Sequence, residues 1–358
     1  MNKLLFLGPA VALLALGAYA CSDDSTAAAP AADYTPMLTS VAQNLIVPGN
    51  ADFVAKAEAF AAAGRDLEAT TTADTYARAQ AAWQAARTSW RKLDAFQFGP
   101  MNDLGLPQQI GVEPAIPADM EKFLTGTRPV DASAVASLGG QNKGFLGTEQ
   151  LLFKTPLADL TGDGIAARRR ALLRYAAEEI AQAAHRLEDA WSATGGNYVN
   201  TFATAGKGSA RYPSQRAALD ELVGGVAFAL EYVVGIRLAM PLGRKTSGTP
   251  DPSLDYTAAS DSTAADIAAS LAGIDEVYAQ DLSGRIANTV LSGRMTSQLR
   301  DCATQVAGLS RPFTTAVTGQ TTVVQAAYDA CKVAKGTWNT DVTSALGATL
   351  RPTDNDGD

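Results

Sequence analysis

The feature that most restricts the fold is the recurrence of hydrophobic residues every three or four positions over long stretches. The clearest case is ADTYARAQAAWQAARTSWRKLDAF, residues 73–96, in which Trp83, Arg87 and Trp90 fall on nearly one side of a helix. Similar patterns cover four further ranges: about 164–192, 213–240, 262–282 and 320–346. Alternating runs between Asn-Gly or Asp-Gly turns, which mark β-hairpins, are missing from the sequence. The sequence therefore predicts an all-α protein with helices long enough to form bundles.

Two irregular stretches interrupt the helical pattern, at 98–117 and 243–262, and both are rich in Gly and Pro. Loops of this length in a compact protein are usually functional or serve as linkers. The segment LADLTGDG, residues 157–164, lies between major helical blocks and is a reasonable domain boundary. We therefore expect one helical bundle at 35–156 and a second at 164–350.

The N-terminus is typical of an exported protein. Residues 1–20 carry one charge, Lys3, ahead of an apolar run, and small residues precede Cys21. Cys21 is either the lipidated residue of a lipoprotein or follows an ordinary signal-peptidase cut. Residues 21–34 are small and polar, as a tether between a lipid anchor and a folded body would be. Beyond the signal, the sequence predicts no apolar run of the roughly 20 residues that cross a bilayer.

The three cysteines bear on this choice. Lipidation of Cys21 leaves Cys302 and Cys331 as an even pair in an oxidising compartment, which favours the lipoprotein. The two residues lie on consecutive predicted helices, so we expect a disulfide that holds the final hairpin. A metal-ligand role for them is weaker, because no other Cys or His is near them in the sequence.

Charge argues against nucleic acid as a partner. The formal net charge is −8, and Lys and Arg are scattered among Asp and Glu along the predicted helices. No basic run is present that could follow a phosphate backbone. The last eight residues, 351–358, form an acidic tail.

Two motifs of the sequence resemble signatures of the imelysin family of exported bacterial proteins. AWQAARTSWRKLDAFQFGP, residues 82–100, is similar to the first signature, a tryptophan-and-arginine helix that runs into an aromatic-Gly-Pro turn. GFLGTEQLLF, residues 144–153, resembles the second signature, G-x-H-x-x-E. The residues that carry the first signature are Trp83, Arg87, Trp90, Gly99 and Pro100, with Asp94 where a glutamate is usual.

The resemblance implies two related four-helix bundles in a protein of the periplasm or outer membrane. It also implies a role in iron acquisition, with envelope iron or haem transport components as partners and the membrane reached through a lipid anchor. Some relatives are described as metallopeptidases. If the family's fold applies, both long loops should lie near Glu149.

The second signature departs from the family pattern at one position. Gly144 and Glu149 match it, but Leu146 occupies the histidine position. At this spacing a histidine and a glutamate would share one helix face, whereas leucine offers no metal ligand. The single histidine of the chain, His185, lies in the other predicted bundle and has the mixed surroundings of a half-buried helix position.

Glu149 has two explanations. It could join other carboxylates in an oxygen-rich site for iron or another divalent or trivalent ion such as Ca²⁺. The candidates for that set are Asp94, Glu113 and Glu231. Alternatively, Glu149 could form a structural ion pair with Arg87 or Arg237.

Three functions remain open on these grounds. The first is a binding or accessory protein in iron or haem acquisition, without catalytic activity. The second is a metal-dependent peptidase, although the sequence has no H-E-x-x-H, no G-x-S-x-G and no Cys-His pair. The third is a docking module of the cell envelope that binds no metal.

Overall fold

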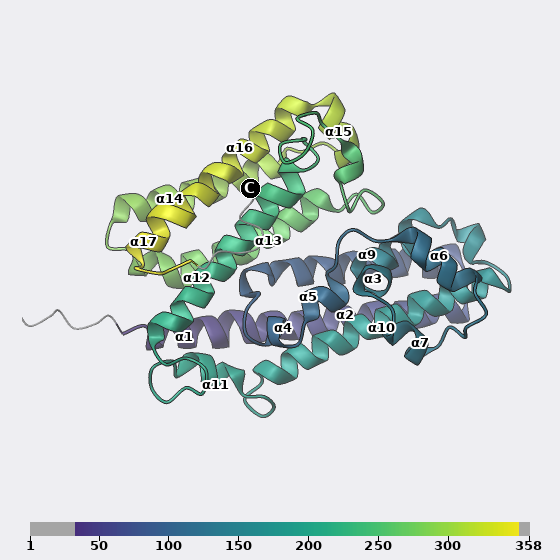
Figure 1. Ribbon diagram of the computed structural model, residues 1–358, viewed down its shortest axis with the longest axis horizontal. Coiled ribbons are helices and arrows are strands. Elements are labelled where there is room, and N and C mark those ends of the chain that lie inside the picture. Colours follow the sequence, from purple (N-terminus) through teal and green to yellow (C-terminus); the bar gives the residue numbers. More distant parts are fainter. Residues whose placement is uncertain (1–32, 351–358) are drawn as a thin grey trace, which may run out of the picture. The chain divides into compact units, whose positions relative to one another are not determined.

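The computed structural model describes residues 33–350, of which residues 34–350 belong to one compact unit (Figure 1). The predicted signal, Cys21, the tether up to residue 32 and the tail from residue 351 lie outside the described residues. Within residues 33–350 the secondary structure is helical and contains no β-strand. The all-α prediction is confirmed.

The first group of helices is built on α2 (Val47–Ala69), α3 (Ala73–Lys92) and α10 (Ile165–Trp191). The helix α3 begins where periodicity predicts, because Thr72 caps it: its Oγ1 accepts a hydrogen bond from the Thr75 amide at 3.2 Å. Both α3 and α10 pack along α2 (Figure 1).

Short helices fill the space around this group. They are α1 (Thr35–Ser40), η1 (Val41–Ile46), η2 (Asp94–Phe96), α4 (Pro100–Asp103), α5 (Leu106–Ile110), α6 (Pro117–Thr125), α7 (Ala132–Ala136), α8 (Gly140–Lys143), α9 (Phe145–Glu149), η3 (Gln150–Lys154), η4 (Leu157–Leu160) and α11 (Tyr198–Ala203). The domain boundary expected at 157–164 falls immediately before α10. Because α10 packs along α2, however, residues 165–191 belong with the first group of helices rather than with the second.

The second group contains the helices from α12 onward, several of which end in a wider π-helical turn. They are α12 (Gln215–Glu231) with η5 (Tyr232–Ala239), η6 (Pro252–Leu254), α13 (Thr263–Val277) with η7 (Tyr278–Leu282), η8 (Ser283–Arg285), α14 (Thr289–Ala307), α15 (Phe313–Gly319), α16 (Thr321–Thr337) with η9 (Trp338–Val342), and α17 (Thr343–Ala345). Figure 1 shows α14 and α16 side by side, in agreement with their packing.

One helix corrects the expectation that no later segment is apolar enough to cross a bilayer. The continuous helix Gln215–Ala239 has the length and composition of a membrane span. Most of its apolar window is buried inside the protein, which is what a core helix of a folded domain also shows. The hydrophobic character of this segment is therefore explained by its place among α13, α16 and η2.

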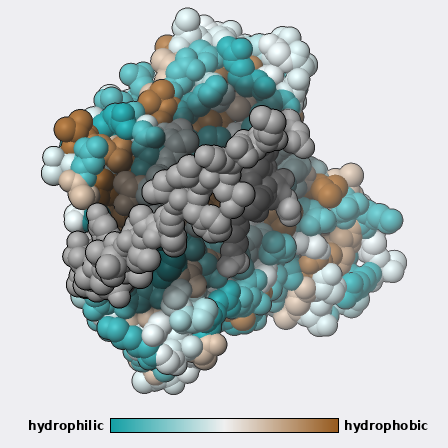
Figure 2. Space-filling model, turned by 60° about the vertical axis from the view of Figure 1, so that its left-hand side comes forward, coloured by the Kyte–Doolittle hydropathy of each residue, from teal (hydrophilic) through white to brown (hydrophobic). Residues whose placement is uncertain are grey.

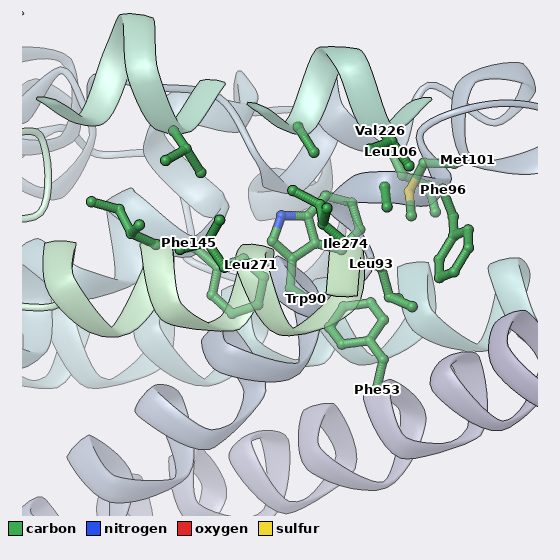
Figure 3. Close-up of a cluster of buried hydrophobic side chains, with 14 of the residues drawn as sticks. Phe53, Trp90, Leu93, Phe96, Met101, Leu106, Phe145, Val226, Leu271 and Ile274 are labelled. Atoms are coloured by element: carbon green, nitrogen blue, oxygen red, sulfur yellow. The ribbon is translucent and has the colours of Figure 1, made fainter. Parts of the chain in front are cut away.

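Aromatic and aliphatic side chains from both groups share one core (Figure 3). Phe53 on α2 and Phe145 on α9 pack on the Trp90 ring, with centroid distances of 5.3 and 6.4 Å. Leu271 and Ile274 of α13 belong to the same buried cluster. Full burial of one such side chain stabilises a fold by about 1.5–3 kcal/mol, so this cluster links the two groups strongly.

Two glycines allow the groups to approach closely. A Cβ on Gly273 of α13 would lie 2.1 Å from the Lys92 carbonyl oxygen, and one on Gly225 of α12 would lie 2.3 Å from the Ala95 carbonyl oxygen. Both distances are far below van der Waals contact. Glycine is therefore required where the end of α3 and the following η2 meet the second group.

The described residues expose few large hydrophobic side chains. On the face drawn in Figure 2, hydrophobic residues occur in small groups between hydrophilic ones. Within residues 33–350 the exposed large hydrophobic side chains are Ile116, Ile165, Val290, Val323 and Val333. Such scattered residues are ordinary on a protein surface.

A disulfide joins Cys302 of α14 to Cys331 of α16, as the sequence predicted. Both cysteines are fully buried. The bond closes a loop with a sequence separation of 29 residues, and it fixes the last helical hairpin.

We predict that reducing this disulfide lowers the free energy of unfolding by about 3–4 kcal/mol, because a loop of this length restricts the unfolded chain by roughly that amount. Urea unfolding with and without a reductant measures the difference. A Cys302→Ala/Cys331→Ala variant is the control and should not respond to the reductant. An unchanged midpoint for the native protein would contradict the prediction.

Candidate functional site

Three buried arginines mark the place where the helix groups meet. Arg87 and Arg91 lie four residues apart on α3 and therefore share one face of that helix. Arg237 approaches from η5 of the second group. All three side chains are at most 3% exposed, so their charges need partners inside the protein.

Glu113, in the loop at 98–117, is the shared partner of these arginines. Its Oε1 accepts hydrogen bonds from Nη2 of Arg87 at 2.6 Å, of Arg91 at 3.1 Å and of Arg237 at 2.6 Å. The Tyr232 hydroxyl donates to Glu113 Oε2. One carboxylate thus joins α3, η5 and the first long loop.

Asp266, in the first turn of α13, is a second carboxylate that balances the positive charges of Arg87 and Arg237. Arg87 donates to Asp266 Oδ2 from Nε at 3.1 Å and from Nη2 at 2.8 Å, and Arg237 Nη2 lies 3.0 Å from the same oxygen. Two hydrogen bonds from one guanidinium to a carboxylate give geometric specificity as well as energy. We call Arg87, Arg91, Arg237, Glu113 and Asp266, together with Asp94, the arginine network.

Asp94 lies at the edge of this network. Its Oδ1 is 3.3 Å from Arg91 Nη1, and its Oδ2 accepts a hydrogen bond from the Ser270 hydroxyl at 2.6 Å. Burial raises the pKa of Asp94, and attraction to Arg91 offsets only part of that rise.

The pKa of Glu113 shifts in the opposite direction to that of Asp94. Burial acts to raise its pKa, but the attraction of Arg237, Arg91 and Arg87 holds the pKa of Glu113 well below its ordinary value. The pKa of Arg87 is raised well above its ordinary value, because the attraction of Asp266 and Glu113 outweighs burial. Ionised groups of both signs are therefore stable in this interior.

Glu149, at the end of α9, is fully buried next to this network. Its Oε1 accepts hydrogen bonds from the Ser260 amide at 2.9 Å and from the Ser260 hydroxyl at 2.6 Å, while Oε2 has no hydrogen-bond partner in the protein. Burial raises the pKa of Glu149 to about 7, and the Ser260 hydrogen bonds and the charge of Arg87 only moderate that rise.

Both long loops lie near Glu149, as expected from the resemblance. Ser260 belongs to the loop at 243–262 and bonds Glu149 directly. The loop at 98–117 packs against the start of α9, where a Cβ on Gly144 would lie 2.5 Å from the Ile110 carbonyl oxygen. Gly144 of the second signature thus permits this close contact.

The candidate metal set is not brought together. Asp94 and Glu113 bind arginines, and Glu231 is held by Lys335 and by Lys245, whose Nζ is 2.7 Å from Glu231 Oε1. Within residues 33–350 no group of three or more His, Cys, Asp and Glu side chains is placed to hold a metal ion. Leu146 is buried and supplies no ligand atom.

These residues do not fit a metal ion near Glu149. A cation would have to compete with Arg87, Arg91 and Arg237 for the carboxylates of the arginine network. The expected alternative, an ion pair between Glu149 and Arg87 or Arg237, is also absent from the described residues. Glu149 bonds Ser260 instead, and Arg87 acts on it only through space.

The first signature serves to place these elements. Trp83 Nε1 donates to the Phe145 carbonyl oxygen at 3.1 Å and to the Thr148 hydroxyl at 3.0 Å, which fixes α9 against α3. Trp90 is buried in the shared core. Gly99 has a positive φ of 52° just before Pro100 opens α4.

His185 lies on α10, where its side chain is 50% exposed and its Nε2 is 2.8 Å from Glu58 Oε1. It is separate from Glu149 in the sequence and takes no part in the arginine network.

Sequence reasoning missed three residues of the site. Arg91 could have been found, because it follows Arg87 by one helical turn. Asp266 and Ser260 gave no signal, since they lie far along the chain from Arg87 and Glu149 and meet them only in the fold.

Fold and site together define an all-α protein in which two groups of helices meet at buried arginines and carboxylates. Residues 46–335 match the sequence model of the imelysin family. This match covers most of the chain, which therefore belongs to the imelysin family.

Three relatives are consistent with this assignment. Iron-regulated protein A of Synechococcus elongatus is 26% identical over 274 residues, or 76% of this chain and 71% of the relative. A crystal structure from Parabacteroides distasonis, described as an iron-regulated protein A precursor, has a TM-score of 0.77 at 18% identity and covers 90% of this chain and 97% of its own. An imelysin-like protein from Psychrobacter arcticum has a TM-score of 0.72 at 15% identity, with 89% and 96% covered. The two crystal structures support the fold.

We predict that Glu149 makes stability depend on pH. Its folded-state pKa of about 7 exceeds the ordinary value of 4.5, so the folded protein binds this proton more tightly than the unfolded chain. Stability from this group is complete below the ordinary value and is lost as pH rises through about 7. The loss between about pH 5 and about pH 8 should be about 2–3 kcal/mol.

Glu149→Gln removes the titrating proton and keeps an oxygen for Ser260. Urea unfolding of both proteins at the two pH values isolates the effect, because contributions from other groups cancel in the difference. The variant should gain stability relative to the native protein as pH rises. Identical pH dependence of the two proteins would contradict the raised pKa.

Proposed function

We propose that this chain is an exported, lipid-anchored imelysin-family protein that serves iron or haem acquisition as a binding or accessory protein and has no peptidase activity. Its partners would be iron or haem transport components of the envelope, which it would reach from a membrane anchor at Cys21. Such an anchor would hold it in the periplasm or on the outer membrane.

The link to iron comes from the relatives. The protein from Synechococcus elongatus is named for its regulation by iron, and the protein from Parabacteroides distasonis carries the same description. The similarity to the protein from Synechococcus elongatus covers 76% of this chain. A role in iron metabolism is therefore the function that the comparisons favour.

The proposal that the protein has no peptidase activity rests on the pairing of its buried carboxylates with arginines. A zinc peptidase uses about three protein ligands and a carboxylate that activates water. Here Glu113 is committed to three arginines, and Leu146 stands where the family motif has its histidine. Glu149 and Asp255 each keep one buried oxygen without a hydrogen-bond partner, but neither belongs to a group of three or more His, Cys, Asp and Glu side chains placed to hold a metal ion within residues 33–350.

The same interior offers groups for a small polar ligand. Arg87 Nη1 and Glu149 Oε2 are buried and have no hydrogen-bond partner in the protein. A buried donor or acceptor without a partner is costly, so each of these two atoms favours a bound water or polar group that supplies its missing partner. This supports binding rather than hydrolysis as the task of the region.

The test is uptake of radiolabelled iron by iron-limited cells of the native host. Deletion of the gene should lower uptake, and both the wild-type gene and the Glu149→Gln variant should restore it, because binding does not need an ionised Glu149. A metal-dependent peptidase would lose its activity with this substitution. In parallel, the purified mature protein should not cleave an unstructured protein substrate.

Two results would contradict the proposal. One is unchanged iron uptake after deletion. The other is cleavage that a chelator abolishes and that Glu149→Gln lacks, together with failure of this variant to restore uptake although it is folded and exported.

A further inference from the structure

A cavity of about 870 Å³ lies beside α12, and its lining contains no member of the arginine network. The helix α12 packs on η2 of the first group and on α16 of the second. Residues of α12 line the cavity together with Asn102 and Gln108 of the first long loop, Lys335 of α16 and Asn339 of η9. We call this space the α12 cavity. Its volume falls within the range of about 300–1,000 Å³ that is typical of ligand pockets.

The residues of α12 that line this cavity form one stripe along the helix. Glu221, Gly224, Phe228 and Glu231 follow one another at three- and four-residue intervals, and all four line the cavity. Helical rise places Glu231 about 15 Å along the axis from Glu221. An extended chain rises about 3.3 Å for each residue, so about five residues would cover this length.

Gly224 is not required by packing within the described chain. A Cβ on its neighbour Gly225 would lie 2.3 Å from the Ala95 carbonyl oxygen, whereas a Cβ on Gly224 would meet no atom of the surrounding residues within 4 Å. Glycine inside a helix is destabilising relative to alanine. The open space above Gly224 instead allows the backbone of a bound chain to approach α12 closely.

An excess of negative charge lies at the Glu221 end of the α12 cavity. Arg211 pairs with Asp103 at 2.6 Å and with Glu221 at 3.6 Å. Arg216 pairs with Asp220 at 2.9 Å. These contacts join three carboxylates to two guanidinium groups, so one negative charge is left without a counterpart among them. A basic side chain of a ligand would balance it.

An excess of positive charge lies at the Glu231 end. Lys245 Nζ is 2.7 Å from Glu231 Oε1, and Lys335 pairs with Glu231 Oε2. One carboxylate thus meets two ammonium groups. An ammonium group has three donors, so Lys335, which lines the cavity, keeps donors for an acidic group of a ligand.

Asn339 adds an unsatisfied polar atom to the lining. Its Oδ1 is buried and has no hydrogen-bond partner among residues 33–350. A buried acceptor without a partner is costly. A peptide group carries both an N–H donor and a carbonyl acceptor, so it can pair with the two ends of this side-chain amide.

We propose that the α12 cavity is a docking site for an extended segment of a partner protein. The segment has a basic side chain at the Glu221 end, an apolar side chain over Gly224 and Phe228, and an acidic side chain that reaches Lys335. Alternate side chains of an extended chain point the same way, so these three occupy its first, third and fifth positions. The site would serve such a partner whether or not the partner transports iron, so this inference goes beyond the proposed function.

The first test is a library of acetylated and amidated pentapeptides, varied at the first, third and fifth positions and screened against the immobilised mature protein. Peptides with Lys or Arg at one end, an apolar residue in the middle and Asp or Glu at the other end should be enriched. Calorimetry then gives the affinity of the most enriched peptide. A screen without enrichment of this charge pattern would overturn the proposal.

Gly224→Leu tests whether the enriched peptide binds in the α12 cavity. The new side chain fills the space above the helix, and binding should weaken at least tenfold. Gly293→Leu is the matched control, because Gly293 also lies inside a helix, α14, its Cβ would meet no atom within 4 Å, and it is not part of this lining. The control should bind as the native protein does. Thermal unfolding verifies that both variants are folded, and equal affinities of the two would contradict the site.

Lys335→Gln tests the charge pairing separately. It removes the ammonium group from the cavity and leaves Lys245 on Glu231. The preference for Asp or Glu over Gln at the end of the peptide should disappear, while peptides that end in Gln should bind as well as before. A merely structural role of Lys335 would weaken all peptides alike. Either that result or a preference that persists in the variant would contradict the assigned pairing.

Discussion

The convergence of Arg87, Arg91 and Arg237 on Glu113 is the interaction on which the rest of the structure depends. Taking such charges out of water costs several kcal/mol for each ion, and only good geometry offsets that cost. The network has this geometry, because each arginine donates to Glu113 at 3.1 Å or less. Arg87 and Arg237 also pair with Asp266. It ties the first long loop to α3, and through η5 and α13 it ties both to the second group of helices. Buried networks of this kind specify one arrangement of elements more than they add stability.

This constraint also shapes the function. An interior whose carboxylates are matched by arginines is poorly suited to bind a cation.

The sequence predicted local structure well and pairings poorly. The helix around Trp83 and Arg87 follows from the spacing of its apolar residues, and the disulfide follows from cysteine parity. Glu113 was identified as important but assigned to a metal, because a carboxylate in a long loop gives no sign of arginines that arrive from 22 to 124 residues away. For the same reason, the contact of α10 with α2 could not be predicted, since periodicity defines the apolar face of a helix and not its partner.

The most direct test of this account is a double-mutant cycle between Arg237→Met and Glu113→Gln, measured by urea unfolding. A desolvated pair in a shared network should show a coupling energy of about 2–3 kcal/mol. The matched surface cycle uses Arg78 and Asp66, whose side chains are 52% and 55% exposed and pair at 3.0 Å; it should give about 0.2–1 kcal/mol. A clearly larger coupling for the buried pair is the predicted result. Equal couplings in the two cycles would contradict the claim that the arginine network holds the helix groups together.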